Sequence, residues 1–596
     1  MKAANFSSQF GKFFTVERTL LIIFIVALLL RFLFLDLKLL HHDESIHSWF
    51  SLRLLNDGIF SYKYDPVYHG PFLYYATAGI FALLGPGDLV ARIVPSILGT
   101  LAVLLVYPIY RLGYLDKKQT IIACLFLAVS PDMVYFSRFL RNDIFVVFLT
   151  LVLLVALLYY IERKELKFAA VGAVAAGCAM SCKENVPIIL MIFGVYLLYL
   201  LYTGKFTLPL KWKRDLAVSL VIIIGIMAVF YSSFGAIPEM IINGPFNALD
   251  HWISMHEEQR LGGPFYFYII LFLLYELPIF ILAIAGVIGF IRYTEKKESL
   301  VAGSSTDYPA VCNECFETEL QEEESEDKLS DETQPEAFPV EESEEKSKGF
   351  VLKISKIIHP GKSFVKSKPV INKNREFTRF CIFWMAASLA VYAYLGEKVP
   401  WLILHQLVPM IFVAVYNIEK WKVWLSAAGV VFLVIMAMHV AFTPADIAEP
   451  IVQVQNSEDL RDVMVFIKSA DRVAISDEVR WPFVWYYMQD YPAKVSYYAK
   501  GYDSSIGPEN YDVIILHDEE KISEIPGFTK YTYKKSYWLD VYNLVQSFRY
   551  AADITNENYR NAIIGDINRL ISYYFTRNSG LGSINLDVFV KNNTSR

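Results

Sequence analysis

The chain contains the stretch TLLIIFIVALLLRFLFLDLKLL (residues 19–40), followed directly by HHDES (residues 41–45). The first stretch is long enough to cross a bilayer, since a spanning helix needs about 20 predominantly apolar residues. The second places two histidines and two carboxylates at the end of that helix, where burial in lipid is costly. An ordinary polar helix end explains these five residues as well as chemistry at the membrane surface does. The polar residues elsewhere in the chain distinguish these two interpretations.

The composition is that of a polytopic membrane protein. Hydrophobic residues make up 55% of the chain and aromatic residues 15%, which lies outside the range of soluble globular proteins. Charge is concentrated in short connectors, in one long acidic segment and in the C-terminal part. The first apolar run has no small-residue cleavage site, so we interpret it as a retained helix rather than a signal peptide. We expect no nucleic-acid partner.

The 20-residue criterion predicts about eleven transmembrane helices. They lie near residues 17–39, 88–111, 118–136, 140–161, 167–182, 184–203, 214–234, 265–292, 376–395, 400–417 and 422–442. Under strict alternation, the connectors rich in lysine and arginine all fall on one face, which the positive-inside rule assigns to the cytoplasm. The sequence therefore predicts a multi-pass protein of the cell membrane, with a cytoplasmic N-terminus and an extracytoplasmic C-terminal domain.

Composition divides the chain into four parts. The predicted parts are a transmembrane module over 1–297 with the outer loop 40–87, a disordered cytoplasmic loop over 298–375, further transmembrane helices over 376–443, and a soluble α/β domain over 444–596. The cytoplasmic loop is acidic to about residue 349 and basic after it. We expect its basic part to lie against anionic membrane lipid.

Local patterns refine the outer loop and the C-terminal domain. Glu44–Asp57 and Pro71–Leu84 are typical of amphipathic helices lying along the membrane surface. In the C-terminal domain, residues 472–475 and 512–516 are predicted strands, and residues 457–469 a helix. The aromatic residues of that domain allow two interpretations, a platform that stacks on a glycan or a core strand. We favour the core strand, because aromatic residues at such spacing usually pack. They are Trp481, Trp485, Tyr486 and Tyr487.

Six polar clusters fall on the predicted outer face. They are His41-His42-Asp43-Glu44-Ser45-x-His47, Tyr64-Asp65-Pro66-x-Tyr68-His69-Gly70-Pro71, Ser137-Arg138-x-x-Arg141-Asn142-Asp143, Cys182-Lys183-Glu184-Asn185, His251-x4-His256-Glu257-Glu258-x-Arg260 and Gly396-Glu397-Lys398-x-Pro400-Trp401. Each cluster alone is more simply a solvated cap, a short ion pair or a loop histidine. Together, beside long buried helices, they predict a polar cavity at the outer leaflet.

This inventory suits a lipid-phosphate substrate. Carboxylates can act as a base or bind a metal, and arginine and lysine at bilayer depth can hold a phosphate while the lipid tail stays in the membrane. The sequence lacks the Ser-His-Asp order of a hydrolase, a Walker A motif and a Gly-x-Gly-x-x-Gly context. Hydrolysis and ATP-driven transport are therefore disfavoured.

The order of these motifs resembles the GT-C superfamily of polytopic glycosyltransferases, including its protein O-mannosyltransferase and aminoarabinose-transferase branches. More narrowly, the chain is similar to the archaeal flippase activity-associated membrane protein group. The similar strings are His42-Asp43-Glu44, Tyr64-Asp65-Pro66-x-Tyr68-His69-Gly70-Pro71-x-Leu73-Tyr74-Tyr75, Lys183-Glu184-Asn185, Gly396-Glu397-Lys398-x-Pro400-Trp401 and Trp481-Pro482-x-x-Trp485-Tyr486. The resemblance covers most of residues 1–500, except the acidic insert 298–349.

The resemblance implies transfer of a sugar from a dolichyl- or polyprenyl-phosphate donor, with inversion at the anomeric carbon. Asp43 would be the base or would position the acceptor, with Glu44 as a neighbour or metal ligand; on a helix the two point about 100° apart. Donor-phosphate binding would fall to Arg138, Arg141, Lys183 and Lys398. Acceptor or substrate binding would fall to His42, Tyr68, His69, Glu184, Glu397 and Trp401. A divalent ion (Mg²⁺, Mn²⁺ or Zn²⁺) would be held by Glu44, His256 and Glu257.

Our leading prediction is a glycosyltransferase that acts at the extracytoplasmic face on a lipid-linked glycan, a protein or a cell-surface polymer. The alternative is a non-catalytic accessory protein that binds lipid-linked oligosaccharide and assists its flipping, since a fold can lose catalysis. An ion-coupled transporter is a third interpretation. It is disfavoured because the ionisable residues cluster at one face rather than at the membrane midplane.

Overall fold

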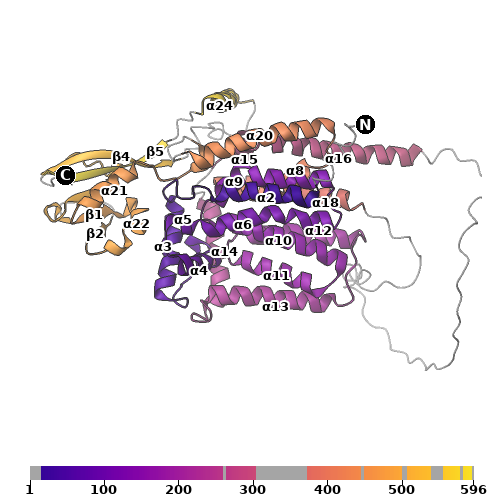
Figure 1. Cartoon of the computed structure of the whole chain (residues 1–596), viewed down its shortest axis with the longest axis horizontal. Helices are drawn as coiled ribbons and strands as arrows, with labels where there is room; N and C mark the ends of the chain where they lie inside the picture. Colours follow the sequence, from indigo (N-terminus) through magenta and orange to yellow (C-terminus); the bar gives the residue numbers. More distant parts are fainter. Residues whose placement is uncertain are drawn as a thin grey trace, which may run out of the picture.

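The computed structural model describes residues 15–258, 263–303, 372–443, 449–499, 506–538, 555–577 and 582–592. Its long helices run side by side in a bundle, and a five-stranded sheet projects from one end (Figure 1). We call this end the sheet end. The opposite end, where α2 begins and α10 finishes, is the far end. The predicted class, a polytopic helical membrane protein with a C-terminal α/β region, is confirmed.

Each predicted span coincides with one helix or with helices in series. The helices of the bundle and its ends are α2 (Val16–Phe32), α3 (His42–Asp57), α4 (Phe72–Leu84), α5 (Asp88–Ala91), α6 (Ile93–Leu104), α7 (Val106–Arg111), α8 (Lys117–Val129), α9 (Pro131–Ser137), α10 (Asn142–Arg163), α11 (Leu166–Met180), α12 (Val186–Tyr202), α13 (Trp212–Tyr231), α14 (Met240–Glu258), α15 (Phe267–Tyr275), α16 (Leu277–Gly303), α18 (Lys373–Tyr394), α19 (Leu404–Ala414) and α20 (Lys420–Phe442). The short 3₁₀ helices η1 (Pro66–Tyr68) and η2 (Pro400–Ile403) lie at the sheet end.

Not all of these helices are long enough to cross a membrane alone. Five are long and apolar enough by themselves, and two bent helix pairs raise the number to seven if each pair is one span. Four shorter apolar helices are Phe72–Leu84, Leu166–Met180, Val186–Tyr202 and Pro400–Ala414. The structure therefore confirms a multi-pass protein but not the predicted number of eleven spans.

Helix α2 illustrates how the sequence orients an apolar helix in the bundle. Its buried residues recur every three or four positions and face the bundle; they are Val16, Leu20, Ile23, Ala27 and Arg31. The intervening residues are equally apolar but open to the surroundings, and Leu21 is 58% exposed. An exposed apolar stripe of this length is a liability in water and is favourable in lipid.

Two predicted spans are broken where proline or its neighbours interrupt the helix. Over 118–136, helices α8 and α9 meet at Ser130 with a bend of 52°. Over 265–292, α15 and α16 meet at Glu276 with a bend of 112°. Pro131 and Pro278 lie in the first turn of the second helix of each pair, where proline is tolerated but the preceding helix cannot continue through it.

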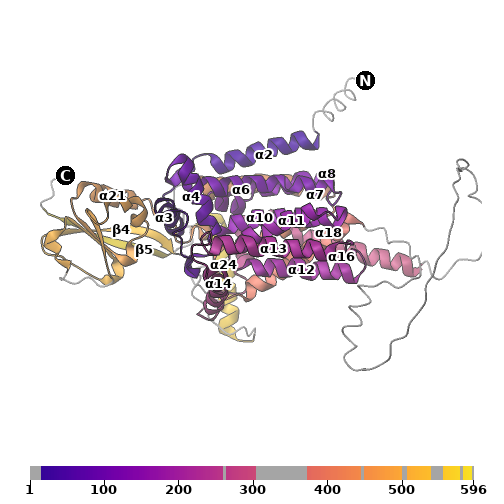
Figure 2. The same ribbon diagram turned by 90° about the horizontal axis from the view of Figure 1, so that it is seen from below.

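The sheet end is covered by elements that cross the bundle rather than continue it. Helices α3 and α4, predicted from the amphipathic patterns of the outer loop, lie there as α3 (His42–Asp57) and α4 (Phe72–Leu84) (Figure 2). Their lengths agree with the predictions to within two residues. These helices and the turns between the long helices carry the polar residues described below.

The C-terminal sheet has the strand order β2-β1-β3-β5-β4. Its strands are β1 (Val473–Ser476), β2 (Val495–Tyr498), β3 (Val513–His517), β4 (Phe528–Trp538) and β5 (Gly582–Lys591). β1 pairs in parallel with β2 and β3, and β5 pairs antiparallel with β3 and β4. Helix α21 (Leu460–Ser469) packs on the sheet through Leu460, Val463 and Ile467. The predicted helix and both predicted strands are present.

The chain leaves the sheet between β4 and β5 and returns to the bundle. Helix α24 (Glu557–Thr576) lies beside the bundle, away from the strands (Figure 1). The Tyr574 ring stacks on Phe432 of α20 with ring centroids 6.4 Å apart, and the Tyr573 hydroxyl donates to the Glu449 carboxylate. The C-terminal region is thus held to the helical bundle along α24.

A second contact joins the sheet region directly to the bundle. Trp485 Nε1 and the Tyr486 hydroxyl donate to the two carboxylate oxygens of Asp88, at 2.8 and 2.6 Å. The Trp485 ring also stacks on Phe81. This aromatic segment forms the short helix α22 (Phe483–Tyr486), so the favoured interpretation as a core strand was wrong. The residues are packed, as predicted, but they dock the domain onto the bundle.

Candidate active site

Two sequence motifs meet because the backbones of their turns bond to each other. The Gly70 N–H donates to the carbonyl of Cys182 at 3.0 Å, and the Phe72 N–H to that of Ser181 at 2.9 Å. A Cβ atom on Gly70 would lie 2.3 Å from the Ser181 carbonyl oxygen, so only glycine permits this approach. The contact places His69 next to Glu184, although 115 residues separate them in the chain.

Asp43 lies in the first turn of α3 and faces the turn before α10. Its carboxylate forms an ion pair with Arg141 and is 24% exposed. Burial raises the pKa of Asp43, but attraction to Arg141 and to His41 outweighs burial and holds the pKa well below its usual range. Asp43 is therefore an ionised carboxylate that remains accessible from the sheet end.

Asp143 is a buried carboxylate that contacts three basic side chains of the site. It lies at the N-terminal end of α10, where the helix dipole favours negative charge, and only 1% of its side chain is exposed. Lys183 Nζ donates to both of its oxygens at 2.8 Å, and His405 Nε2 lies 3.0 Å from Oδ1. Arg141 Nε lies 3.7 Å from Oδ2. We call Asp43, Arg141, Asp143, Lys183 and His405 the Asp43 cluster.

Arg141 is also held by an aromatic ring. Its guanidinium carbon lies 3.7 Å from the centroid of the Trp401 ring, a close cation–π contact. Trp401 comes from the 3₁₀ helix η2, so the Gly-Glu-Lys-x-Pro-Trp motif reaches the same place as the Asp43 motif. Arg141 thus lies between two carboxylates and against an aromatic face, in one fixed position.

His69 and Glu184 form a neighbouring pair beside this cluster. His69 Nδ1 lies 2.9 Å from Glu184 Oε2, and the Tyr64 hydroxyl donates to Oε1 at 3.4 Å. Burial raises the pKa of Glu184, but His69 and Lys183 lower it to a net value below the usual range. A small pocket of about 50 Å³ opens here, lined by His69, Lys183, Glu184, Asn185, Glu397 and Tyr392 among others.

Glu44 does not join the Asp43 cluster. Its carboxylate is fully buried and pairs with Arg92 at 2.6 Å. Its two oxygens also accept the backbone N–H of His41 and of Leu140, both at 2.9 Å. With His41 as N-cap, Glu44 completes a capping box at the start of α3. We call Glu44, Arg92 and these two amides the Glu44 cluster.

Two of the predicted phosphate-binding cations lie elsewhere. Arg138 donates to the carbonyls at the end of α2, among them those of Leu33 at 2.6 Å and Phe34 at 2.7 Å. Lys398 donates to carbonyls at the end of α18, including that of Ala393 at 2.8 Å, and burial lowers its pKa to about 8. Both side chains satisfy carbonyls that a helix end leaves without a partner. Of the four predicted cations, Arg141 contacts Asp43 and Lys183 pairs with Asp143 in the same cluster.

The remaining predicted residues lie at the edge of the site or outside the described side chains. His42 precedes Asp43 in the first turn of α3, and Glu397 lines the small pocket. The Tyr68 carbonyl accepts a hydrogen bond from the Tyr74 hydroxyl at 2.7 Å. The side chains of His256 and Glu257 lie outside the described residues. Among the side chains that are described, no three His, Cys, Asp or Glu residues are grouped to hold a metal.

The sequence reasoning did not single out three residues that complete the site. Asp143 belongs to the motif whose arginines were predicted to bind phosphate. His47 belongs to the motif whose carboxylates were predicted to be catalytic. His405 follows Trp401 by four positions, which places both on one face of the η2–α19 segment. That spacing was the available signal. His47 Nδ1 lies 2.8 Å from the Tyr74 hydroxyl, which links α3 to α4.

Comparison with known proteins agrees with the motifs. Residues 68–231 match the family model described as dolichyl-phosphate-mannose-protein mannosyltransferase. The matched region runs from η1 through α13 and includes Arg141, Asp143 and Lys183. No curated protein sequence matches the chain.

Several solved structures align with the chain at low sequence identity. ArnT from Cupriavidus metallidurans bound to undecaprenyl phosphate aligns with a TM-score of 0.50 and 12% identity, over 87% of this chain and 96% of that one. The oligosaccharyltransferase of Archaeoglobus fulgidus in complex with Zn and sulfate aligns with a TM-score of 0.43 and 13% identity, over 84% of this chain and 68% of that one. The protein O-mannosyltransferase Pmt1-Pmt2 complex of S. cerevisiae bound to the sugar donor aligns with a TM-score of 0.32 and 18% identity, over 37% of this chain and 34% of that one.

The family match confirms the resemblance over residues 68–231. The ArnT alignment covers almost the whole of both chains and shows the same fold. The present chain spans only about a third of the yeast chain.

Proposed function

We propose that this protein is a membrane glycosyltransferase that takes a sugar from a dolichyl- or polyprenyl-phosphate donor and attaches it to a lipid-linked glycan, a protein or a cell-surface polymer. The observation that supports this best is Asp43, an ionised and partly exposed carboxylate at the end of a membrane bundle. It contacts Arg141, in a cluster in which Lys183 pairs with Asp143. A GT-C fold and a family model for dolichyl-phosphate-mannose-dependent transferases support the same reaction class.

The proposed reaction has one displacement step. The acceptor hydroxyl oxygen forms a bond to the anomeric carbon while the bond from that carbon to the phosphate oxygen breaks. The electron pair of the broken bond leaves with the lipid phosphate, and the acceptor proton passes to the Asp43 carboxylate. Attack from the face opposite the leaving group inverts the configuration of the sugar. A positioned base typically contributes 10²–10⁴-fold to such a step.

Arg141 couples donor binding to the strength of this base. In the free protein, Arg141 pairs with Asp43 and keeps the pKa of that carboxyl low, which makes it a weak base. A donor phosphate beside Arg141 and Lys183 would share their positive charge. The pKa of Asp43 would then rise toward its ordinary value when, and only when, the donor is present.

Two further parts of the proposal follow from the arrangement. The sheet end would be the extracytoplasmic end, because the lysine-rich connectors gather at the far end. The small pocket beside His69 and Glu184 would receive part of the acceptor or of the sugar.

The test is transfer of labelled sugar from dolichyl-phosphate donors by the full-length protein in lipid. Wild type is compared with Asp43→Asn and with Asp57→Asn. Asp57 lies at the other end of α3, is 46% exposed and pairs with Arg53, so its substitution controls for loss of a carboxylate in the same helix. We expect Asp43→Asn to abolish most transfer while it still binds the donor, and Asp57→Asn to behave as wild type.

The opposite result identifies the alternative function. If neither wild type nor variant transfers sugar to any of the offered acceptors, but both bind lipid-linked oligosaccharide tightly, the protein is a binding protein. It would then be a candidate accessory to flipping. Equal transfer by wild type and Asp43→Asn would contradict the role of Asp43 while leaving the reaction class in place.

A further inference from the structure

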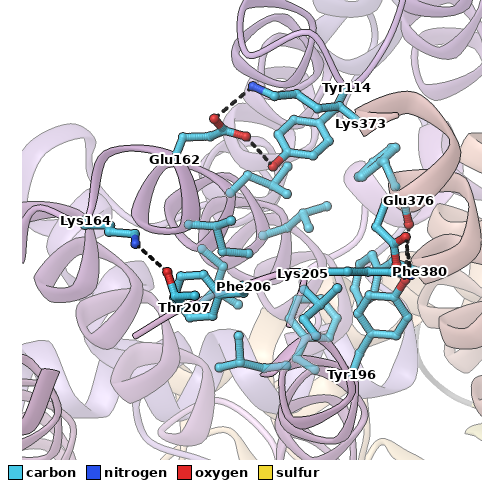
Figure 3. Close-up of a pocket in the computed structure, with 18 of the residues that line it drawn as sticks. Tyr114, Glu162, Lys164, Tyr196, Lys205, Phe206, Thr207, Lys373, Glu376 and Phe380 are labelled. Carbon is cyan, nitrogen blue, oxygen red and sulfur yellow. Dashed lines mark hydrogen bonds and ion pairs between the residues drawn. The ribbon is translucent and has the colours of Figure 1, made fainter. Parts of the chain in front are cut away.

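A large apolar cavity of the described structure lies at the far end, away from Asp43. It has a volume of about 440 Å³ and is bounded by the ends of α10 and α12, the start of α18 and Tyr114 (Figure 3). Asp143 lies in the first turn of α10 and Glu162 in its last turn, so a rise of 1.5 Å per residue separates the Asp43 cluster from this cavity by roughly 28 Å. We call this cavity the far pocket.

The walls of the far pocket are apolar. They include Leu154, Leu158, Phe193, Leu197, Leu200 and Phe380. Next to them, α12 presents Leu198 and Tyr202 to the surroundings, with 65% and 82% of their surfaces exposed. In a bundle that spans a membrane, such exposed residues face lipid. The far pocket therefore lies where an acyl or isoprenoid chain can enter from the side.

The rim of the far pocket carries three lysines, and Figure 3 shows their partners. Lys373 pairs with Glu162 at 2.8 Å, and Lys205 pairs with Glu376 at 2.7 Å. Lys164 Nζ donates only to the Thr207 hydroxyl, at 2.9 Å; among the described residues no carboxylate forms an ion pair with it.

The carboxylates at the rim are already shared. Glu376 also pairs with Arg379 and accepts the Tyr196 hydroxyl at 2.6 Å. Glu162 accepts the Tyr114 hydroxyl at 2.8 Å in addition to its lysine. The rim thus has three lysines and two carboxylates, and one of these carboxylates is shared with Arg379, so the rim keeps a positive surplus centred on Lys164 and Lys205. A surplus of this kind attracts an anion.

We propose that the far pocket binds a membrane lipid through a phosphate headgroup. The phosphate lies between Lys164, Lys205 and Lys373, and one hydrocarbon chain lies against the leucines and phenylalanines of α10, α12 and α18. A free phosphate ion would leave the apolar walls uncovered and most of the volume empty. A neutral lipid would leave the surplus charge unpaired. A lipid phosphate satisfies both parts of the site at once.

This site is separate from the proposed transfer reaction. It is built from the opposite ends of the same long helices, and it contains none of the residues of the Asp43 cluster. The lipid would hold α10, α12 and α18 together at the end where the cavity separates them. Its binding can therefore be measured without a sugar donor, and failure of either proposal leaves the other standing.

The experiment is native mass spectrometry of the full-length protein in detergent, titrated with dioleoyl phosphatidylglycerol. Dioleoyl phosphatidylcholine carries the same chains with no net charge, and inorganic phosphate carries the charge with no chain. We expect one saturable phosphatidylglycerol adduct and roughly tenfold weaker binding of phosphatidylcholine. Inorganic phosphate at the same concentration should leave the adduct in place.

Two variants locate the binding site. Lys164→Gln with Lys205→Gln removes the surplus charge, and we expect phosphatidylglycerol to bind at least about tenfold more weakly. Leu197→Trp fills the apolar part and should abolish the adduct without changing any charge. The control is Lys118→Gln, because Lys118 is an exposed lysine in the first turn of α8 that does not line the far pocket.

Three results would overturn the proposal. Equal affinity for both lipids would remove the role of the phosphate charge. Displacement of the lipid by inorganic phosphate would make the site one for a free anion. An adduct that persists unchanged in the double lysine variant, with the protein still folded, would place the lipid elsewhere on the molecule.

Discussion

The Asp43 cluster and the Glu44 cluster begin at neighbouring residues of one helix turn but differ in exposure and in partners. Asp43 is 24% exposed and pairs with one arginine, which is shared with a second carboxylate. Glu44 is fully buried, and both of its oxygens are occupied by Arg92 and by backbone amides. The helix separates the two side chains by about 100°, which turns one toward the membrane surface and the other into the bundle.

This difference in exposure means that the Asp43 carboxylate can change partners and the Glu44 carboxylate cannot. Asp43 can exchange Arg141 for an acceptor hydroxyl, because its cluster opens to the outside and contains more than one cation. Removal of a partner from Glu44 would leave a charge in a dry site, which is strongly unfavourable. We therefore interpret the Asp43 cluster as functional and the Glu44 cluster as structural. Four experiments test this division.

The largest expected effect is on turnover after Asp43→Asn. The substitution keeps the shape of the side chain and removes the base, so sugar transfer should fall by about 10²–10⁴-fold. Because Asp43 is partly exposed, the apparent melting temperature in detergent should stay close to that of wild type. A large fall in melting temperature would instead give Asp43 the structural role that we assign to Glu44.

The reverse pattern is expected for Arg92→Met. The variant leaves Glu44 buried without its cation, and such a loss typically destabilises a protein by about 3–5 kcal/mol. The apparent melting temperature should fall, and the molecules that remain folded should keep their rate of transfer per molecule. Combining it with Glu44→Gln should restore part of the stability, since no uncompensated charge remains. An unchanged melting temperature for the single variant would contradict this assignment.

A smaller effect concerns pH and His47, which lies one turn after Asp43 on the same face of α3. Burial, and then the nearby Arg141, lowers the pKa of His47 to about 3. An unfolded histidine has a pKa near 6.5, so between pH 6.5 and 3 the unfolded chain binds the extra proton. The contribution of this histidine to stability is complete above pH 6.5 and decreases as the pH falls. At pH 5 the loss is about 2 kcal/mol.

The measurement is the fall in apparent melting temperature between pH 7.5 and pH 5. It should be smaller in His47→Gln than in wild type, because glutamine does not take up the proton. His517→Gln serves as the control, since His517 lies at the end of β3, far from the Asp43 cluster. The same pH dependence in wild type and His47→Gln would show that His47 is not buried in its neutral form.

The smallest expected effect concerns the contact beside the Glu44 cluster. Asp88 lies one helical turn before Arg92 and accepts hydrogen bonds from Trp485 and Tyr486 of the C-terminal domain. Asp88→Asn makes these bonds neutral, and a charge-assisted bond is about twice as strong as a neutral one. Amide hydrogen exchange in α22 should become faster by roughly tenfold. Asp490→Asn in the same domain is the control, and equal exchange in both variants would exclude Asp88 as the anchor.

Much of the fold could be predicted from local sequence patterns. The apolar runs gave the positions of the helices, and the amphipathic stretches after residue 43 and after residue 71 gave α3 and α4 to within two residues. The length of an apolar run does not show whether its helix is continuous. Two predicted spans are bent where Pro131 and Pro278 lie in the first turn of a new helix. The aromatic segment around Trp485 was wrongly assigned to a strand. Its spacing indicates packing but does not say against which surface.

The sequence predicted which residues belong to the candidate site, but it did not predict which side chains contact each other. Asp43, Arg141, Lys183, His69 and Glu184 were all identified from their motifs, and the structure brings them to one end of the bundle. Arg138 and Lys398 come from equally suggestive motifs, yet they satisfy carbonyls at the ends of α2 and α18. A motif shows that a cation is present at a helix end. It does not show whether the cation turns toward the helix or away from it.

The sequence by itself therefore determined the membrane character of the chain, the order of its helices, its C-terminal strands and the motifs that resemble GT-C enzymes. Only the tertiary structure decided that Glu44 binds Arg92, that His405 reaches Asp143 across 262 residues, and that α24 returns to the bundle. Periodicity is a local property, set by the geometry of the helix or strand. The partner of a buried charge depends on which distant segment packs there, because a charge removed from water must find its counter-charge wherever the fold provides it.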